Sequence, residues 1–346
     1  MNPAQSLVPP PDAEAQAEKP KKPRRRSGSR PLAYYLEAYA LVILLIVAAI
    51  FFSVYQGTSD TFPTAANLRI LVASQAVIAI VSIGVLLPLV TQEFDLSVGA
   101  VAALSAVVVA ELLSKSTPAL LAILIGIGVG GAIGFINAMI VTRLRVNAVV
   151  ATLGMGTIVG GMITQITGGL ATASDIPAFL TTFGTGNVLG IPAIFLAMLV
   201  VAGVAFFVLE HTPFGRYLYA YGSNPHAALL VGVRTDFIRA MAFIVGGTLA
   251  GLAGVFYVAR AGGADPKLSQ TFLLPSFAAA FLSAASIRPG RFNVWGTLVA
   301  IYFLAVLNNG LNLAGAAPYV SDYINGGALI IGLSLAAYLS RRRVRG

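Results

Sequence analysis

The feature that constrains this chain most is a succession of apolar runs, each long enough to cross a lipid bilayer. About 20 apolar residues suffice to cross ~30 Å of hydrocarbon. Hydrophobic residues make up 57% of the chain and charged residues only 10%, against about 25% charged residues in a soluble globular domain. The runs predict ten transmembrane helices, near residues 33–56, 67–90, 96–113, 118–142, 147–168, 188–209, 237–259, 272–288, 293–314 and 323–340. We therefore predict an all-α polytopic membrane protein.

The basic residues are distributed unevenly about these runs. If the N-terminus lies in the cytoplasm and the spans alternate, all but four of the 22 Lys and Arg residues fall on the cytoplasmic side. The four exceptions are Arg69, Lys115, Arg260 and Lys267. The positive-inside rule describes such a bias, and an odd number of spans would destroy it. We therefore expect both termini in the cytoplasm.

Residues 1–31 form a separate segment that is rich in Pro, Ala, Lys and Arg and has almost no large apolar side chains. Such a composition cannot support a hydrophobic core, so we expect a disordered tail. Its stretch KPKKPRRRSGSR could be read as a nucleic-acid patch, but a cytoplasmic position beside anionic lipid accounts for the charge. We expect membrane lipid as its neighbour, no nucleic acid and no signal peptide.

The chain shows no catalytic constellation. It has no cysteines, which excludes thiolate metal ligands and cysteine nucleophiles. After the tail the only lysines are Lys115 and Lys267, and neither stands in a phosphate-binding G-x-x-x-x-G-K-[ST] loop. The histidines, His211 and His226, lie in a predicted cytoplasmic connection without an acidic cluster. We expect no metal site and no enzyme activity on this chain, and any ATP hydrolysis by another subunit.

Ionisable residues in mid-span, which ion-coupled transporters usually carry, are almost absent. The residues at these depths that could line a path for a polar, uncharged solute are neutral: Gln75, Asn137, Asn308, Asn309 and Asn312. Asn308 and Asn312 share a helix face because they are four residues apart. Hydrogen bonding between helices accounts for the same residues equally well, so both interpretations remain open. Ser82 and Gln165 are the other polar mid-span residues.

The stretch QEFDLSVG, residues 92–99, brings two carboxylates, Glu93 and Asp95, to the junction of the second and third apolar runs. Asp95 or Ser97 is well placed as the N-cap of the third helix. Glu93 adds negative charge near the positive end of that helix dipole. We therefore interpret Asp95 and Ser97 as a helix cap and not as part of a proton relay.

Glycine is abundant, with 36 residues, and it is patterned. The runs are GIGVGGAIG (126–134), GMGTIVGG (154–161) and GGTLAGLAG (246–254). Small residues at helical spacing let membrane helices approach closely, and no strand–turn–helix context makes these runs a dinucleotide-binding loop. We expect all three runs to form contacts between helices.

Several of these stretches resemble permease subunits of bacterial ABC sugar importers of the ribose and xylose type. FDLSVGAVAAL (94–104) is similar to the motif that follows the second span in that family, and NAMIVTRLRVNAVVATLGMGTIVGG (137–161) resembles a second motif. TPFGRYLYAYGSNPHAALLVGV (212–233) is similar to a cytoplasmic loop of the family. The resemblance runs in order from about residue 33 to 342, and the permeases of branched-chain amino-acid importers are related.

The resemblance implies a permease domain over residues 32–342 in the bacterial cytoplasmic (inner) membrane. It implies that residues 210–236, the coupling loop, carry a short helix near 224–232 that docks on an ABC ATPase subunit. The implied coupling residues are Phe214, Gly215, Arg216, Gly222, Asn224, Ala227, Ala228 and Gly232. It further implies an extracytoplasmic solute-binding protein and a second permease copy, most simply in a homodimer. ATP and Mg²⁺ would bind to the ATPase subunit, and no cofactor to this chain.

Two departures from the family pattern lie near the predicted cytoplasmic face. Gln92 and Glu93 stand where small residues are usual, and SAASIRPGRF, residues 283–292, replaces a stretch of small or apolar residues. We expect an ATP-driven importer of a monosaccharide or polyol. A branched-chain amino-acid permease is the alternative within the class, and an ATP-independent secondary transporter is the alternative outside it.

Overall fold

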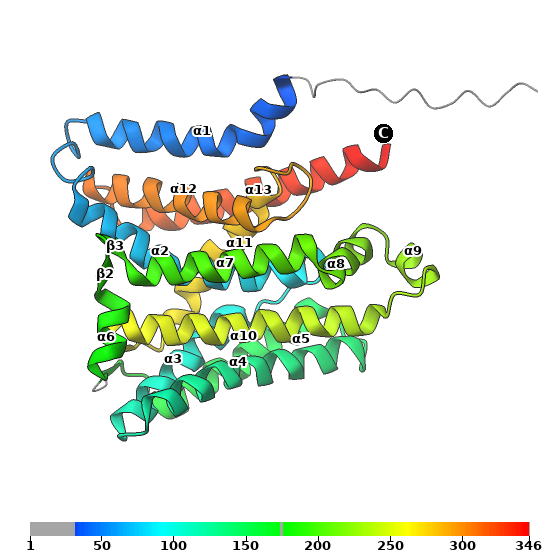
Figure 1. The fold of residues 1–346 in the computed structure, drawn as a ribbon, viewed down its shortest axis with the longest axis horizontal. Helices are drawn as coiled ribbons and strands as arrows, with labels where there is room; N and C mark the ends of the chain where they lie inside the picture. The colour runs from blue at the N-terminus through cyan, green and yellow to red at the C-terminus, as the bar shows by residue number, and fades with distance from the viewer. Residues whose placement is uncertain (1–31, 174–175, 346) are drawn as a thin grey trace, which may run out of the picture.

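The structure is a computed structural model that describes residues 32–173 and 176–345, and it is built almost entirely of helices (Figure 1). The predicted tail lies outside the described residues. The long helices of the described chain are α1 (Leu32–Val54), α2 (Ala65–Val90), α3 (Val98–Ser114), α4 (Ala119–Thr142), α5 (Ala148–Thr167), α7 (Ala193–His211), α10 (Thr235–Ala261), α11 (Leu268–Ser283), α12 (Val294–Leu313) and α13 (Tyr319–Arg345). Each of them overlaps one of the predicted runs.

The structure confirms an all-α polytopic membrane protein. Seven helices are long and apolar enough to cross a membrane, namely α2, α4, α5, α7, α10, α12 and residues 319–338 of α13. Three further apolar helices are shorter, at residues 38–54, 98–114 and 268–283. The ten-span count therefore stays a prediction.

Short elements gather at the two ends of the bundle (Figure 1). At one end, called here the α6 end, lie α6 (Ala178–Thr185) and the ribbon of β2 (Asn187–Val188) with β3 (Ile191–Pro192). A second ribbon pairs β1 (Thr172–Ala173) with β4 (Gly263–Ala264). At the other end, the α8 end, lie α8 (Pro213–Ser223) and α9 (Pro225–Leu230). The described chain begins and finishes at the α8 end as well (Figure 1).

Two predicted boundaries were wrong because turns interrupt the apolar runs. The helix expected at 188–209 begins at Ala193, because Leu189 and Gly190 both have positive φ, 53° and 84°, and form the turn between β2 and β3. The helix expected at 272–288 is α11, which ends at Ser283. Residues 284–292 form turns instead, with Ile287 at a φ of 61° and its N–H donated to the carbonyl of Ala38.

The core forms around α10, which packs against α2, α3 and α4. Two of the three glycine runs lie in this contact, as expected: a Cβ on Gly130 would be 2.3 Å from the carbonyl oxygen of Gly247, and one on Gly84 would be 2.9 Å from that of Gly246. The third run meets the expectation only at Gly156, where an added Cβ would be 3.6 Å from the Cα of Ser97. A Cβ added to Gly154, Gly160 or Gly161 would meet no atom within 4 Å, because these glycines lie on the face of α5 that packs against no other helix.

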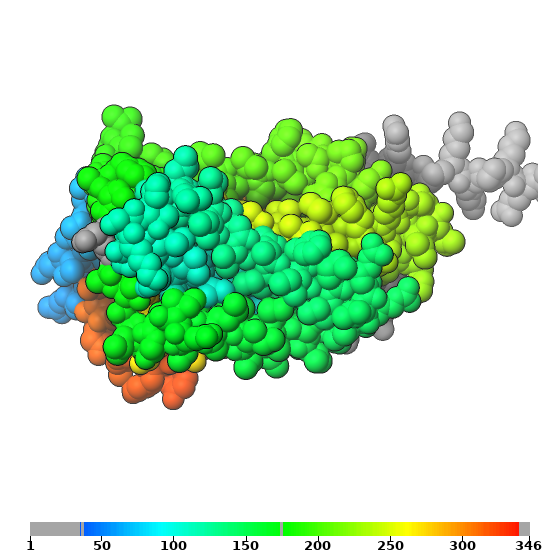
Figure 2. Space-filling model, turned by 90° about the horizontal axis from the view of Figure 1, so that it is seen from below, coloured from blue at the N-terminus to red at the C-terminus, as the bar shows by residue number. Residues whose placement is uncertain are grey.

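Apolar side chains cover the outside of the bundle as well as its core. The face seen in Figure 2 is crossed by α4, whose Leu120, Leu124 and Phe135 are 69%, 57% and 54% exposed. Large apolar side chains on the surface of a soluble protein would be anomalous in such numbers. On a helix that crosses a bilayer they face the lipid, so this surface is explained by the membrane and needs no protein partner.

Candidate functional site

The coupling loop folds as two short helices whose starts are encoded locally. Thr212 precedes Pro213 and accepts the N–H of Gly215 at 3.4 Å, which begins α8. Asn224 precedes Pro225 and accepts the N–H of Ala227 through Oδ1 at 3.0 Å, which begins α9. Proline suits the first helical position, because the N–H that it lacks has no partner there. The helix expected near 224–232 is α9, and α8 was not predicted.

Three glycines of the coupling loop are required by geometry. A Cβ on Gly215 would lie 2.1 Å from the carbonyl oxygen of Leu209, and one on Gly222 would lie 1.9 Å from that of Val90. Gly232 has a φ of +82°, which is strained for residues with a side chain. Of the other expected coupling residues, Phe214 is half-buried, Ala228 is buried, and Arg216 and Ala227 are exposed.

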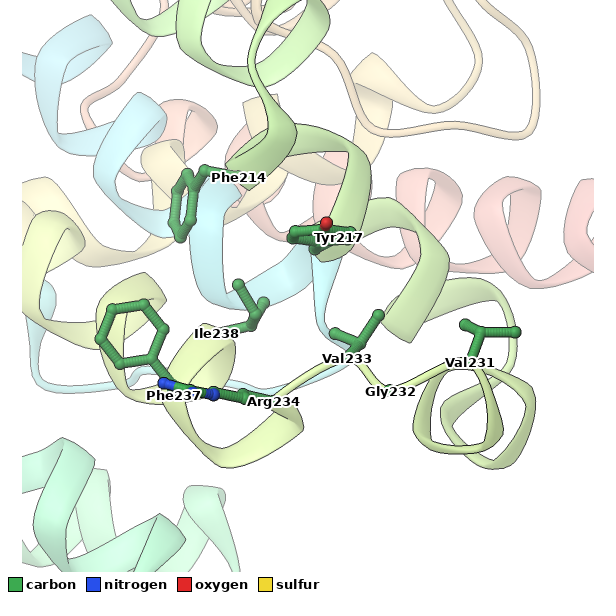
Figure 3. A pocket seen from close by; sticks show the side chains of 8 residues that line it. All are labelled: Phe214, Tyr217, Val231, Gly232, Val233, Arg234, Phe237 and Ile238. Carbon is green, nitrogen blue, oxygen red and sulfur yellow. The ribbon is translucent and has the colours of Figure 1, made fainter.

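An apolar pocket of about 440 Å³ opens between α8 and the start of α10. Phe214 and Tyr217 line it from α8, and Phe237 and Ile238 line it from α10 (Figure 3). Val231, which follows α9, also lines the pocket and is 79% exposed, and the adjacent Leu230 is 87% exposed. In Figure 1, α9 lies beyond the ends of the long helices α7 and α10. The coupling loop therefore presents an apolar surface that fits a protein partner.

Residues 92–93 and 283–292, which depart from the family pattern, both contact the coupling loop. The sequence did not predict these contacts. Gln92 donates its side-chain amide to the carbonyl of Gly222, and Glu93 pairs with Arg239 at the start of α10, with 2.8 Å between Nε and Oε1. The Arg239 guanidinium lies 5.9 Å from the centre of the Tyr221 ring.

The second departure forms a cluster with Glu210, at the end of α7. Arg288 and Arg291 both pair with its carboxylate, the latter at 3.3 Å. Arg291 lies 3.5 Å above the centre of the Tyr219 ring, and the Tyr219 hydroxyl donates to the carbonyl of Phe292 at 2.8 Å. Burial raises the pKa of Tyr219 above its ordinary value, against the effect of Arg291, so the hydroxyl keeps the proton that it donates. This cluster fastens α8 to the loop between α11 and α12.

The predicted helix cap at QEFDLSVG was wrong in its hydrogen bonds. α3 begins at Val98 with Ser97 in the N-cap position, but the Ser97 side chain accepts no N–H from the helix. The buried Asp95 carboxylate instead accepts the backbone N–H of Ser97 at 3.0 Å and its hydroxyl at 2.6 Å. Burial raises the pKa of Asp95 to about 6, although both hydrogen bonds from Ser97 oppose the shift. Glu93 does not serve the dipole of α3, because it is paired with Arg239.

The candidate residues for a solute path do not come together. Asn137 is buried and donates to the Ser97 hydroxyl at 2.8 Å, so it belongs to the Asp95 network. Asn309 exchanges two hydrogen bonds, of 3.0 and 3.1 Å, with Asn67 of α2. For these two residues the structure favours bonding between helices. Asn67 was missed because its partner lies in a distant part of the sequence.

The remaining candidates are less enclosed. Asn308 donates to Asn325 of α13 at 3.4 Å, and its own Oδ1 is buried without a partner in the described part of the chain. Gln75 is half-buried within α2, and Asn312 is exposed at the end of α12. These three residues therefore stay compatible with a solute path.

The outward face of α5 carries polar side chains among exposed apolar ones such as Leu153 and Ile158. Thr157, Thr164 and Gln165 are exposed on it, beside the uncovered glycines Gly154 and Gly161. The opposite face, with Ala151, Met155 and Val159, packs against α3 and α4. A glutamine amide facing hydrocarbon would lack hydrogen-bond partners, so this face suits a second protein surface or a water-filled path.

Comparison with known proteins identifies the family. The family described as "Branched-chain amino acid transport system / permease component" matches residues 67–333. The chain belongs to this permease family. No solved structure matches it. The family consists of transport permeases and is not a class of enzymes. Among the described residues of this permease, no group of three His, Cys, Asp or Glu side chains could hold a metal ion.

Curated relatives of the permease cover most of its length. It is 33% identical over 290 residues to the ribose import permease protein RbsC of Escherichia coli (strain K12), which covers 83% of this chain and 89% of the relative. It is 31% identical over 300 residues to the D-allose transport system permease protein AlsC of the same strain, covering 86% and 91%. It is 28% identical over 308 residues to the fructose import permease protein FrcC of Rhizobium meliloti, covering 87% and 85%. These matches confirm the resemblance seen in the sequence motifs.

Proposed function

We propose that this permease is the membrane-spanning subunit of an ATP-driven importer that carries a monosaccharide or polyol into the cytoplasm of a bacterium. Relatives named for ribose, allose and fructose support a sugar over a branched-chain amino acid as the solute. A separate ATPase subunit binds ATP and Mg²⁺, and an extracytoplasmic solute-binding protein supplies the solute. The scarcity of charged residues in mid-span supports a neutral solute.

The observation that carries this proposal is the apolar surface of the coupling loop at the α8 end. Leu230 and Val231 stand uncovered there, beside the pocket lined by Phe214 and Phe237. A protein that hydrolyses ATP on the same side of the membrane would bury these side chains. The bias of Lys and Arg toward this end supports its being cytoplasmic, with ten spans and both termini inside the cell.

The test is the recovery of an ATPase subunit with the permease after gentle extraction from native membranes. Leu230→Asp places a charge in the proposed interface. Leu170→Asp is the matched control, because Leu170, which follows α5 shortly before β1, is 73% exposed and lies away from the coupling loop. We expect wild type and Leu170→Asp to retain an ATP-hydrolysing subunit and solute uptake, and Leu230→Asp to lose both while remaining folded in the membrane.

Two results would contradict the proposal. Leu230→Asp that retains the ATPase subunit and normal uptake would remove the coupling loop from the interface. The second result concerns the wild-type permease by itself: if it is recovered without an ATPase subunit and, after reconstitution alone, takes up solute when an ion gradient is imposed, it is a secondary transporter.

A second copy of the permease completes the proposed assembly, with the solute path beside the polar face of α5. The chain has no cysteine, so a single introduced cysteine reports contact between copies without background. Gln165→Cys should form a cross-linked dimer with a short bifunctional reagent in native membranes. Leu124→Cys, on the lipid-facing side of α4, should not. Equal cross-linking of both variants would contradict a defined interface on α5.

A further inference from the structure

A pocket of about 290 Å³ lies at the α6 end, away from the coupling loop. It is lined by Arg69 near the start of α2, by Arg260 in the last turn of α10, by Thr185 at the end of α6 and by Asn187 at the start of β2. Ile70 and Pro192 add apolar walls. Arg69 and Arg260 are two of only four basic residues that the sequence places on this side of the membrane, so their meeting in one pocket concentrates the positive charge of that side.

The charge of this pocket is not neutralised within the described chain. Arg69 donates through Nε to the carbonyl of Gly190 at 3.0 Å, which leaves its two terminal nitrogens to other partners. Neither guanidinium lies within ion-pair distance of a carboxylate among the described residues. Asp265, which also lies at this end, instead accepts the N–H of Lys267. Two guanidinium groups around one cavity match an anionic oxygen group, because each presents a fork of donors.

The surroundings of the pocket indicate where such an anion comes from. α2 and α10 are both long and apolar enough to cross a membrane, and the ends of such helices lie at the depth of lipid headgroups. The ribbon of β2 and β3 borders the pocket, and its Val188, Leu189 and Ile191 are 52%, 98% and 43% exposed. Apolar side chains that are this uncovered beside a charged pocket fit the boundary between headgroups and acyl chains.

We propose that Arg69 and Arg260 bind the phosphate group of a membrane phospholipid, with the apolar side chains of the β2–β3 ribbon beside its acyl chains. The Asn187 side-chain amide, which makes no hydrogen bond within the described chain, faces the polar remainder of the headgroup. The lipid joins the start of α2, the end of α10 and the β2–β3 ribbon, three segments that are far apart in the sequence.

The experiment compares the thermal unfolding of the purified, delipidated full-length permease with added dioleoylphosphatidylglycerol, with a neutral diacylglycerol of the same acyl chains, and with inorganic phosphate. A ligand that binds only the folded state raises the midpoint of unfolding, and at saturating phosphatidylglycerol we expect a rise of roughly 3 °C or more. We expect the double variant Arg69→Gln/Arg260→Gln to lose most of that rise. Lys267→Gln, which removes an exposed basic residue on the same side outside the pocket, should keep it.

The outcomes separate the sources of the anion. A rise with phosphatidylglycerol but not with inorganic phosphate or diacylglycerol establishes the lipid phosphate as the ligand. An equal rise with inorganic phosphate in wild type, lost in the double variant, establishes the same site with free phosphate as its occupant. A full rise in the double variant, or an equal rise with diacylglycerol, overturns the proposal. If the glutamine variant does not fold, Arg69→Lys/Arg260→Lys takes its place, because it keeps the charges but loses the paired donors of each guanidinium. A smaller rise than in wild type then supports the site, and a full rise overturns it.

Discussion

The cluster around Glu210 provides the most direct test of how the coupling loop is held. Glu210→Gln preserves the shape of the side chain but removes the charge that pairs with Arg288 and Arg291. The side chains of Glu210, Arg291 and Arg288 are 13%, 29% and 43% exposed. Breaking a fully buried ion pair costs about 3–5 kcal/mol, and an exposed pair contributes about 0–1 kcal/mol.

The exposure of each partner decides between these figures. The pair of Glu210 with Arg288 is screened by solvent, so its free energy lies near that of an exposed pair. The pair of Glu210 with Arg291 is less exposed, so its free energy lies between those of an exposed pair and a buried pair. We therefore expect Glu210→Gln to lower the free energy of unfolding by roughly 2 kcal/mol. For a chain of 346 residues the midpoint should fall by roughly 3 °C. The fluorescence of Trp295, the single tryptophan, follows the transition.

A double-mutant cycle assigns the effect to the pair. Glu210→Gln, Arg291→Gln and the double variant should show an interaction free energy of roughly 1–2 kcal/mol. The control is Glu111→Gln, since the pair of Glu111 with Lys115 is a surface pair with exposures of 31% and 69%. It should change stability by less than about 0.5 kcal/mol. Additive effects of Glu210→Gln and Arg291→Gln would refute the argument, and so would equal losses in Glu210→Gln and Glu111→Gln.

The glycine contacts and the Asp95 network give two further predictions. Gly130→Ala should cost at least roughly 2 kcal/mol of stability, because the new Cβ would lie 2.3 Å from the carbonyl oxygen of Gly247. Gly154→Ala should be neutral or stabilising by up to ~1 kcal/mol, because its Cβ meets no atom. Equal unfolding midpoints of these two variants would contradict the contact at Gly130. Burial raises the pKa of Asp95 from 3.8 to about 6, so the folded state binds this proton more tightly than the unfolded chain does. The ionised carboxylate therefore lowers the stability of the folded state above pH 6. This loss of stability disappears as the pH falls from 6 toward 4. Wild type should therefore gain up to roughly 3 kcal/mol between pH 7 and pH 4 that Asp95→Asn does not gain, and parallel pH profiles of the two unfolding midpoints would show that Asp95 does not carry the effect.

The class of the protein and most of its helices follow from local properties of the chain. A span needs only enough consecutive apolar residues, so each long helix could be located within a few residues. The starts of α8 and α9 are local too, because Thr212 and Asn224 cap the helices that begin at the prolines after them. The motifs around Asp95 and the coupling loop, residues 210–236, sufficed to indicate the permease family.

Partners that lie far apart in the sequence could not be read in the same way. Asn67 bonds to Asn309, Glu93 to Arg239 and Glu210 to Arg291, and nothing near either member of a pair indicates the other. The Gly154–Gly161 run is rich in glycine like the runs in the core, yet Gly154, Gly160 and Gly161 face outward, because packing of α5 on α3 and α4 uses its opposite face. Arg69 and Arg260 are exceptions to the charge bias, and only the folded chain shows that they line one pocket. A run of residues determines whether it enters the membrane, and only the arrangement of all the helices determines which of its faces meets protein, lipid or solute.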